Sequence, residues 1–189
     1  PKLFKGVHRN SEAPSDFKRE TLFYQSAIHD IDSMRWLMKS EVEEVTVRGA
    51  HVDPKVDANA RDMALITLSL RCGGLATIEA YVSANYGYEV SAEVVGDEGT
   101  IITTQPDQVL IRTKGARLVK VPEEWLARFD LAYINELNHW VKSLMEETTV
   151  GANAWDGYTA LLVADACIQS LNSGQPVRVS IPEKPEIYH

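Results

Sequence analysis

The chain has 189 residues, 44% hydrophobic and 24% charged, a composition typical of one globular domain. Its net charge is −8, with no basic run, so nucleic acids and anionic membranes are excluded as expected partners. The longest mainly apolar run, residues 155–171, contains Asp156, Asp165 and Gln169, which argues against a transmembrane segment. Two cysteines without metal or redox spacing, and no signal-peptide pattern, favour a reduced, cytoplasmic protein.

The first predicted elements are a strand over residues 2–8, a polar loop over 9–20 and a helix that ends near Lys39. In this helix Gln25, His29, Asp32 and Trp36 share a polar column at i, i+4, i+7 and i+11. The other side carries an apolar stripe that can lie on a sheet: Ala27, Ile28, Ile31, Met34, Leu37 and Met38. A histidine between hydrogen-bonding side chains on an anchored helix suits proton transfer, although a surface or core histidine fits the same pattern.

The middle of the chain is rich in predicted strands, followed by two long helices. β-Branched and alternating residues predict strands over 44–48, 64–71, 76–84, 89–95, 100–104, 109–113 and 117–121. Cys72-Gly73-Gly74, Gly96-Asp97-Glu98-Gly99 and Lys114-Gly115-Ala116 predict tight turns between strands. Helices are predicted over 126–146 and 154–173, the second with Asn153 as N-cap and Gly174 as stop signal, before a short strand over 176–181.

This order of elements predicts an α+β fold: an open, predominantly antiparallel mixed sheet with helices packed on one face. Sequence motifs for nucleotide binding or covalent catalysis are missing. There is no Gly-x-Gly-x-x-Gly after a strand, no phosphate-binding loop and no Gly-x-Ser-x-Gly. The five histidines stand far apart in the sequence, so a metal site is not expected either.

A set of short segments occurs in a characteristic order along the whole chain: His8-Arg9-Asn10; Ala27-Ile28-His29-Asp30-Ile31-Asp32 with Arg35-Trp36-Leu37; Tyr81-Val82 with Tyr86-Gly87-Tyr88; Glu93-Val94-Val95-Gly96 with Glu98-Gly99; Arg128-Phe129 with Ala132-Tyr133; Ala154-Trp155-Asp156-Gly157-Tyr158; and Glu183-Lys184-Pro185-Glu186. This ordered set resembles the C-terminal domain of the Gfo/Idh/MocA oxidoreductases, most closely the inositol 2-dehydrogenases. The resemblance implies the dihydrodipicolinate-reductase-like α+β fold of that domain.

The resemblance also implies roles for individual residues. His29 would be the general base that takes the proton of a substrate hydroxyl as hydride leaves for nicotinamide. Relatives carry aspartate four residues earlier, where this chain has Gln25, which cannot stabilise an imidazolium by charge; Asp32 could partly substitute for it. His8, Asn10 and Tyr88 would contact the substrate, and each can both donate and accept hydrogen bonds, as hydroxyls require.

The resemblance further implies a two-domain, NAD- or NADP-dependent dehydrogenase acting on a polyol or sugar. Residues 1–189 would form its substrate-binding and oligomerisation domain, and the start at Pro1 indicates a piece whose N-terminal Rossmann domain is absent. The chain alone would be inactive, and the open sheet face would form a homodimer or homotetramer. Two alternatives stay open: a non-catalytic binding or assembly domain that has lost its aspartate, or a dehydrogenase for another alcohol, such as an amino sugar or a lactone precursor.

Overall fold

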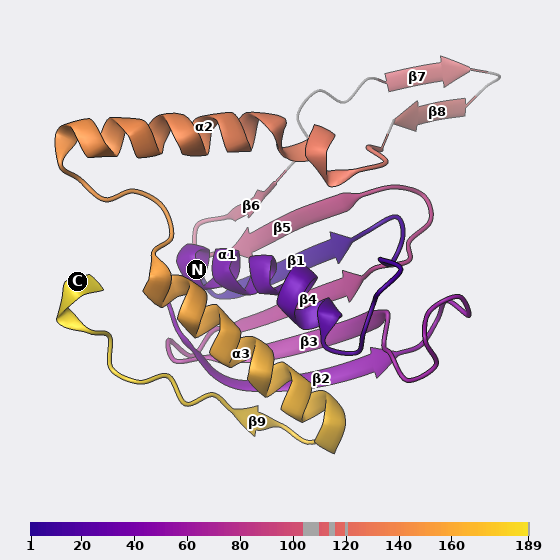
Figure 1. Ribbon diagram of the computed structural model, residues 1–189, viewed down its shortest axis with the longest axis horizontal. Coiled ribbons are helices and arrows are strands. Elements are labelled where there is room, and N and C mark those ends of the chain that lie inside the picture. The colour runs from indigo at the N-terminus through magenta and orange to yellow at the C-terminus, as the bar shows by residue number, and fades with distance from the viewer. Residues whose placement is uncertain (104–109, 114–115, 120, 189) are drawn as a thin grey trace.

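A seven-stranded mixed sheet forms the centre of the molecule (Figure 1). The computed structural model describes residues 1–103, 110–113, 116–119 and 121–188. The sheet order is β6-β5-β1-β4-β3-β2-β9, and β1 and β4 are its parallel pair. The strands are β1 (Leu3–Arg9), β2 (Val42–Ala50), β3 (Met63–Leu70), β4 (Leu75–Tyr81), β5 (Glu89–Val95), β6 (Thr100–Ile102) and β9 (Val177–Arg178). The predicted α+β class with a predominantly antiparallel sheet is therefore confirmed.

One face of the sheet is covered by a layer of helices. A π-helical segment, η1 (Leu22–Ala27), continues into α1 (Ile28–Met38), which packs over β1 and β4, while α3 (Ala154–Ser173) packs over β2. Alternate residues of the strands meet these helices, because successive side chains of a strand point to opposite faces. The resulting core includes Phe4, Ile66, Leu68 and Ile78 from strands and Ile31, Met34 and Val163 from helices. Burial of each such side chain contributes roughly 1.5–3 kcal/mol.

Local signals fix both ends of α3. The Asn153 side chain accepts hydrogen bonds from the backbone N–H groups of Trp155 and Asp156, and the Asp156 carboxylate accepts one from the Asn153 N–H at 2.9 Å. This reciprocal capping box satisfies donors that a helix N-terminus leaves free. Gly174 ends the helix with φ +66°, a left-handed conformation that glycine adopts without a steric penalty. The predicted bounds 154–173 are confirmed.

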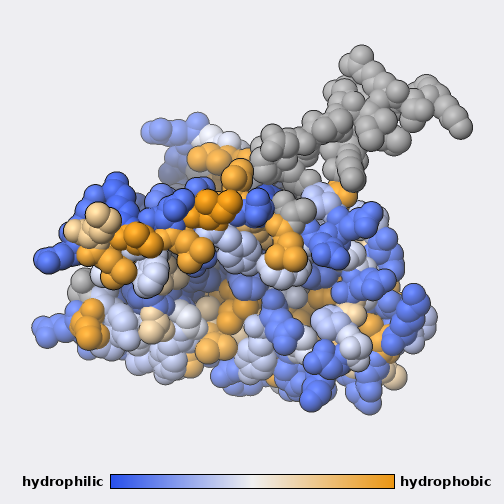
Figure 2. Space-filling model, turned by 45° about the horizontal axis from the view of Figure 1, so that its top comes forward, coloured by the Kyte–Doolittle hydropathy of each residue, from blue (hydrophilic) through white to orange (hydrophobic). Residues whose placement is uncertain are grey.

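The third long helix, α2 (Trp125–Glu146), is arranged differently. It runs above the β5–β6 edge of the sheet and does not pack over it as α1 and α3 do (Figure 1). Most of its described apolar side chains are exposed, and hydrophobic surface gathers over it in Figure 2. The exposed set is Trp125, Leu126, Leu131, Tyr133, Ile134, Leu137, Trp140, Val141, Leu144 and Met145. The prediction of helices on one sheet face thus holds for α1 and α3. By contrast, the apolar side chains of α2 are mostly left uncovered by the described residues.

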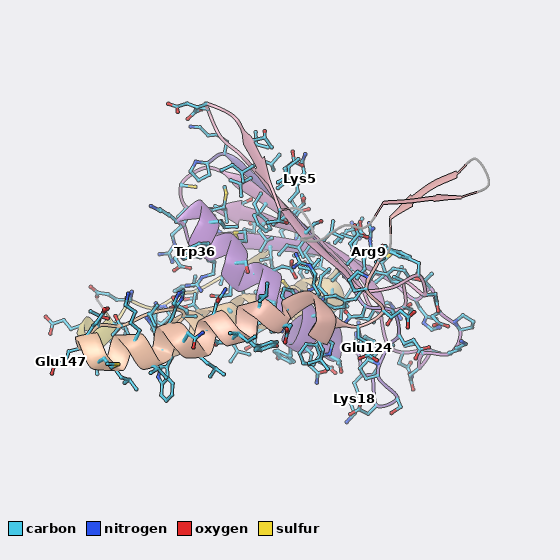
Figure 3. All side chains as sticks on the ribbon, turned by 90° about the horizontal axis from the view of Figure 1, so that it is seen from above. Lys5, Arg9, Lys18, Trp36, Glu124 and Glu147 are labelled. Carbon is cyan, nitrogen blue, oxygen red and sulfur yellow. The ribbon has the colours of Figure 1, made fainter. Side chains whose placement is uncertain are left out.

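The sheet face away from the helices carries both charged and apolar side chains. Lys5 pairs with Glu93 at 3.0 Å, and Arg9 pairs with Glu79 at 2.6 Å and Glu89 at 2.9 Å. Figure 3, seen from above, places Lys5 on the side of the sheet opposite α1. The exposed apolar residues Leu65 and Leu75 lie on the same face, as the strand registers require. This face is therefore mixed rather than uniformly apolar.

Most predicted element boundaries lie within a few residues of the observed ones. The Cys72-Gly73-Gly74 hairpin joins β3 to β4, and β7 (Leu110–Thr113) and β8 (Ala116–Val119) form a separate antiparallel pair. The predicted strand over 176–181 is shorter, as β9, and a 3-10 turn, η2 (Glu186–Tyr188), follows it. Residues 104, 109 and 120, and the predicted turn at 114–115, lie outside the described residues. In the described part of the chain, no helix combines the length and apolarity needed to cross a membrane.

Candidate active site

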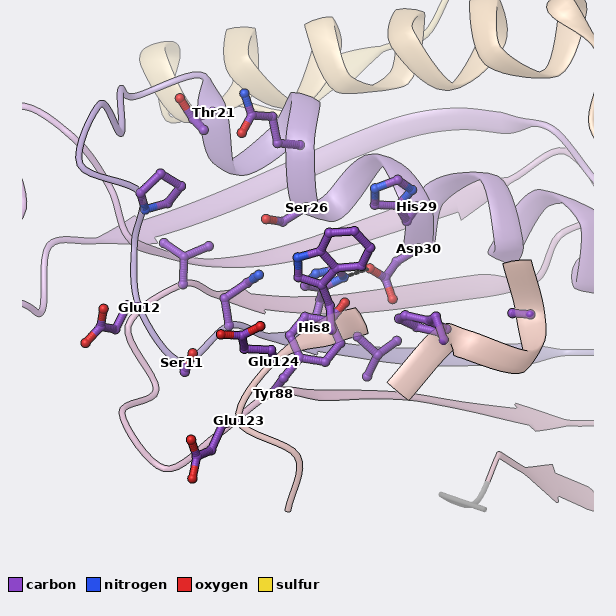
Figure 4. Close-up of a pocket in the computed structure, with 18 of the residues that line it drawn as sticks. His8, Ser11, Glu12, Thr21, Ser26, His29, Asp30, Tyr88, Glu123 and Glu124 are labelled. Atoms are coloured by element: carbon purple, nitrogen blue, oxygen red, sulfur yellow. Dashed lines mark hydrogen bonds and ion pairs between the residues drawn. The ribbon is translucent and has the colours of Figure 1, made fainter. Parts of the chain in front are cut away.

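A cavity of about 680 Å³ opens between the helix layer and the beginning of α2 (Figure 4). It lies at the end of β1, next to η1 and α1, and residues 123–136 close its other side. All five residues predicted for the site line this one cavity: His8, Asn10, Gln25, His29 and Tyr88. The tertiary structure therefore brings together residues that are spread over 80 positions of the chain.

The helix residues of the site are held by the packing of α1. Ile31 and Met34 are fully buried against the sheet, so the opposite side of the helix, with His29, faces the cavity. Gln25 lies in η1, where π-type hydrogen bonding replaces the regular α-helix that the sequence pattern predicts. A π-turn is wider than an α-turn, and both side chains still reach the cavity.

His8 forms a buried pair with Asp30. The His8 Nδ1 and Asp30 Oδ2 atoms are 2.8 Å apart, and both side chains are at most 5% exposed. The His8 ring stacks against His29, with 6.3 Å between centroids, and meets the Tyr88 ring edge-on at 5.7 Å. Gly6 lies beside this pair: a Cβ there would lie 2.9 Å from the Phe4 ring but at an ordinary contact distance of 3.4 Å from Asp30 Oδ1. Two imidazoles and a phenol thus share one wall.

Asn10 presents an unpartnered acceptor. Its backbone N–H donates to the Tyr81 carbonyl and its carbonyl accepts from the Ala84 N–H, both at 2.9 Å, which fixes the residue at the end of β1. Its side-chain Oδ1 is buried and has no hydrogen-bond partner among the described residues. A buried carbonyl without a partner costs about 1–3 kcal/mol, so a ligand hydroxyl that donates to it would recover this energy.

Tyr88 enters the cavity through a tight contact with the segment before α2. Its backbone N–H donates to the Pro122 carbonyl at 2.6 Å. The preceding Gly87 has φ +140°, and a Cβ there would lie 2.6 Å from the same carbonyl oxygen, so glycine is required for this approach. Burial, and next the negative charge of Asp30, raise the pKa of Tyr88 to about 12. The phenol therefore remains a neutral donor and acceptor at physiological pH.

The predicted polar column of α1 divides between two cavities. Gln25 and His29 face the site, whereas Asp32 and Trp36 line a neighbouring cavity. The rise of 1.5 Å per residue carries these two positions along the axis and away from the site. Asp32 Oδ1 lies 3.4 Å from Arg35 Nη1. Burial raises the pKa of Asp32, whereas the positive charge of Arg35 and, less strongly, that of His29 lower it, so the carboxylate interacts with both and its partial substitution for the missing aspartate stays a prediction.

Asp30 is the site residue that the sequence reasoning missed, although a signal for it exists. It lies among the apolar positions Ala27, Ile31 and Met34, and a carboxylate in an apolar stripe requires a buried partner. Trp125, Phe129 and Tyr133 of α2 also line the cavity without having been predicted to do so. Their contribution depends on where α2 lies, which no local pattern encodes.

The charges that line the cavity are of one sign. The lining includes Asp30 and the four glutamates Glu12, Glu123, Glu124 and Glu136, with no lysine or arginine among the described lining residues. Within the described part of the chain, no group of three or more histidine, cysteine, aspartate or glutamate side chains could hold a metal ion. The site therefore suits a neutral ligand rich in hydrogen-bonding groups better than an anion.

A polar cavity beside a helix-covered mixed sheet is consistent with an oxidoreductase substrate domain, and comparison with known proteins identifies the family. Residues 15–179 match the family described as "Oxidoreductase family, C-terminal alpha/beta domain". The chain belongs to this family, the C-terminal domain of the Gfo/Idh/MocA oxidoreductases, as its resemblance indicated.

The relatives include inositol 2-dehydrogenases. The chain is 43% identical over 189 residues to inositol 2-dehydrogenase of Rubrobacter xylanophilus, and 37% identical over 188 residues to inositol 2-dehydrogenase 1 of Saccharopolyspora erythraea. All of this chain is covered, but only 54% and 56% of those proteins, so the chain spans about half their length. The myo-inositol dehydrogenase of Lactobacillus casei, solved with NAD(H) and myo-inositol, superposes with a TM-score of 0.91 at 27% identity, covering 100% of this chain and 57% of that one.

Proposed function

We propose that this chain is the substrate-binding domain of a dehydrogenase that oxidises a secondary hydroxyl of a polyol or sugar such as myo-inositol. The observation that carries the proposal is the single cavity in which His8, His29, Gln25 and the unpartnered Asn10 Oδ1 meet. These groups donate and accept in the mixture that adjacent hydroxyls require. The inositol dehydrogenases among the relatives support the same class of substrate.

The charge of the cavity supports a neutral substrate. Sugar phosphates and sugar acids need cationic partners, and the described lining supplies carboxylates instead. Calorimetric titration of the chain with myo-inositol tests the proposal, with myo-inositol 1-phosphate as the matched anionic ligand. We expect saturable heat for the polyol and much weaker binding of the phosphate. Equal binding of both, or none of the polyol, would contradict the proposal.

In the proposed reaction His29 accepts the proton of the substrate hydroxyl. Its neutral imidazole has a free nitrogen lone pair for this transfer, and its position on the anchored helix α1 fixes its direction. Gln25, one turn before, would orient the hydroxyl or the ring by hydrogen bonding. His8, Asn10 and Tyr88 would hold the remaining hydroxyls and so select which carbon faces the base.

The sheet of the described residues differs in topology from a dinucleotide-binding fold. Apart from the β1–β4 pair, the strand pairs of the sheet are antiparallel, and no glycine-rich strand–turn–helix occurs in the sequence, so a pyrophosphate cradle of the usual type is missing here. We therefore propose that NAD or NADP, the hydride acceptor, is bound mainly by a separate N-terminal domain. Titration of this chain with NAD⁺ and NADH should give no saturable heat; micromolar binding would overturn this division.

Oligomerisation through the open sheet face is part of the proposal. Its helix-free side exposes Leu65 and Leu75 between charged pairs, a mixture that a symmetric second copy could cover. Multi-angle light scattering at micromolar concentration should give the mass of a dimer or tetramer. Leu65→Lys should shift it toward the monomer, whereas Leu137→Lys on α2 should not. A monomeric wild-type chain would contradict the proposed oligomerisation.

The second candidate function is a binding or assembly domain without catalysis. Gln25 favours it: the family resemblance implies an aspartate at this position, and glutamine cannot stabilise a charged imidazole. Polyol binding by the chain is expected under both hypotheses. Oxidation of the bound polyol by the longer protein, with reduction of the nicotinamide, would separate them in favour of the enzyme.

A further inference from the structure

The buried carboxylate of the cavity is paired with His8 and not with His29. Asp30 Oδ2 lies 2.8 Å from His8 Nδ1, and no other hydrogen bond to Asp30's carboxylate occurs among the described residues. An ionised carboxylate can only accept hydrogen bonds, so the proton of a neutral His8 ring must lie on Nδ1. The other nitrogen, Nε2, then carries a lone pair, and it has no hydrogen-bond partner in the described part of the chain.

We propose that Asp30 is a positioning residue that holds His8 in the Nδ1–H tautomer, so that Nε2 accepts a hydrogen bond from a substrate hydroxyl. The identity of the ligand rests on the proposed function, whereas the tautomer does not. Together with Asn10 Oδ1, this places two acceptors on the wall formed by the end of β1. The site thereby selects ligands with at least two hydroxyl donors on one side, and disfavours deoxy analogues that leave an acceptor unpaired.

A purely structural role explains Asp30 poorly. Its neighbours along the helix face are the fully buried Ala27, Ile31 and Met34, where an apolar residue would pack without desolvating a charge. An ionised carboxylate in such surroundings is retained only where a specific hydrogen-bond partner offsets the cost of its desolvation. The Asp30 carboxylate contacts only the Nδ1 atom of His8, as expected if Asp30 serves to fix the tautomer of that ring.

The groups around His8 do not compete with Asp30 for Nδ1. His29 of α1 stacks on the ring and Tyr88, before β5, meets it edge-on, and neither is hydrogen-bonded to it. The glutamates that line the cavity from the loop after β1 and from the start of α2 form no described hydrogen bond with His8. Asp30 is thus the described group that determines the tautomer.

Nitrogen-15 NMR of the histidine rings in the intact chain tests the inference. We expect His8 in the wild type to carry its proton on Nδ1, with an unprotonated Nε2. In Asp30→Asn the amide can donate to Nδ1, so the proton should move to Nε2, as in serine protease triads when the aspartate becomes asparagine. Asp32→Asn, a neighbour on the same helix that pairs with Arg35, is the matched control and should leave His8 unchanged. A wild-type His8 protonated only on Nε2 overturns the inference without any variant.

Calorimetric titration with myo-inositol measures how the same variants bind the proposed ligand. Loss of one hydrogen-bond acceptor should weaken binding by about tenfold in Asp30→Asn. If Asp30 acts through His8, Asp30→Asn should have no further effect in a His8→Phe background; the same tenfold loss there would overturn the inference. A wild type with the expected tautomer that binds no polyol overturns the substrate proposal and this ligand assignment. The opposite tautomer with intact polyol binding overturns the positioning role alone.

Discussion

Two helices face the cavity, and they are held in different ways. α1 has Ala27 before it and Ile31 and Met34 within it, all fully buried against the sheet, so the direction of His29 follows from the core. α2 contributes Trp125, Phe129 and Tyr133 to the opposite wall, but most of its described apolar residues are exposed. Its described anchors lie near its beginning, where Pro122 accepts from the Tyr88 N–H and Phe129 meets the Tyr88 ring edge-on at 6.1 Å.

This difference gives the site one wall whose backbone is held by the core, on α1, and one wall that is held less firmly, on α2. The polar wall, where a proton would be transferred, stands on a backbone that cannot move without disturbing the core, although the His29 and Gln25 side chains themselves are exposed. The aromatic wall lies on a helix most of whose apolar side chains are exposed, and it could adjust to a ligand or to a neighbouring surface. The following predictions, from the largest expected effect to the smallest, test whether the two helices differ in this way.

The largest effect should come from the histidine on the anchored helix. In the longer protein proposed to carry this domain, His29→Ala should lower kcat by about 10²–10⁴-fold, the usual range for a positioned acid–base group. Substrate affinity should change less, because other hydrogen bonds remain. His139→Ala, on exposed α2 and outside the cavity lining, is the matched control and should keep wild-type kcat. Steady-state kinetics measure both, and full activity of His29→Ala would remove this histidine from the mechanism.

Stability should respond to truncation in α1 and hardly at all in α2. Ile31→Ala empties a fully buried position and should lower the free energy of unfolding by about 2–5 kcal/mol. Leu137→Ala, whose side chain is 62% exposed, should change it by less than about 0.5 kcal/mol. Urea denaturation of the chain measures both. A comparable loss in Leu137→Ala would show that α2 is covered in solution, and the contrast between the helices would fail.

The attachment of α2 should depend on Gly87. Gly87→Ala places a Cβ 2.6 Å from the Pro122 carbonyl in a left-handed backbone region, so both the contact and the backbone resist it. We expect a loss of about 1–3 kcal/mol and weaker polyol binding. Gly151→Ala is the matched control, because Gly151 has φ +78° and open space around an added Cβ. It should show only the free-energy cost of placing alanine in a left-handed backbone conformation and should leave polyol binding unchanged. Equal effects of the two variants on binding would contradict the proposed anchor.

The smallest effect concerns alkaline pH. The pKa of Tyr88 is about 12 in the folded chain, against about 10 for an unperturbed tyrosine. Between these values the unfolded state loses the proton while the folded state keeps it, so this stabilising contribution is complete below pH 10 and falls as pH rises toward 12. Tyr88→Phe should flatten this part of the pH–stability curve, measured by urea midpoints. An unchanged curve in Tyr88→Phe would mean that its phenol titrates normally.

Local sequence determined much of this fold. Residues 154–173 were predictable as a helix because Asn153, Asp156 and Gly174 act on neighbouring backbone groups. Strand alternation and the hairpin at Cys72-Gly73-Gly74 follow from the same short-range geometry. That Gln25 and His29 line one cavity was likewise predictable, since residues four apart lie on one side of a helix, although the segment with Gln25 is π-helical.

Only the tertiary structure decided the rest. The His8–Asp30 pair joins residues 22 positions apart through the packing of α1 on β1, and the parallel β1–β4 pair joins more distant segments still. The sequence marked Asp30 as a carboxylate in an apolar stripe but could not name its partner, because burial forces a charge to find one without specifying which. The many apolar residues of α2 can also be read from the sequence. A hydrophobic pattern shows that a surface favours burial, while the surface that covers it is determined by the arrangement of the whole chain.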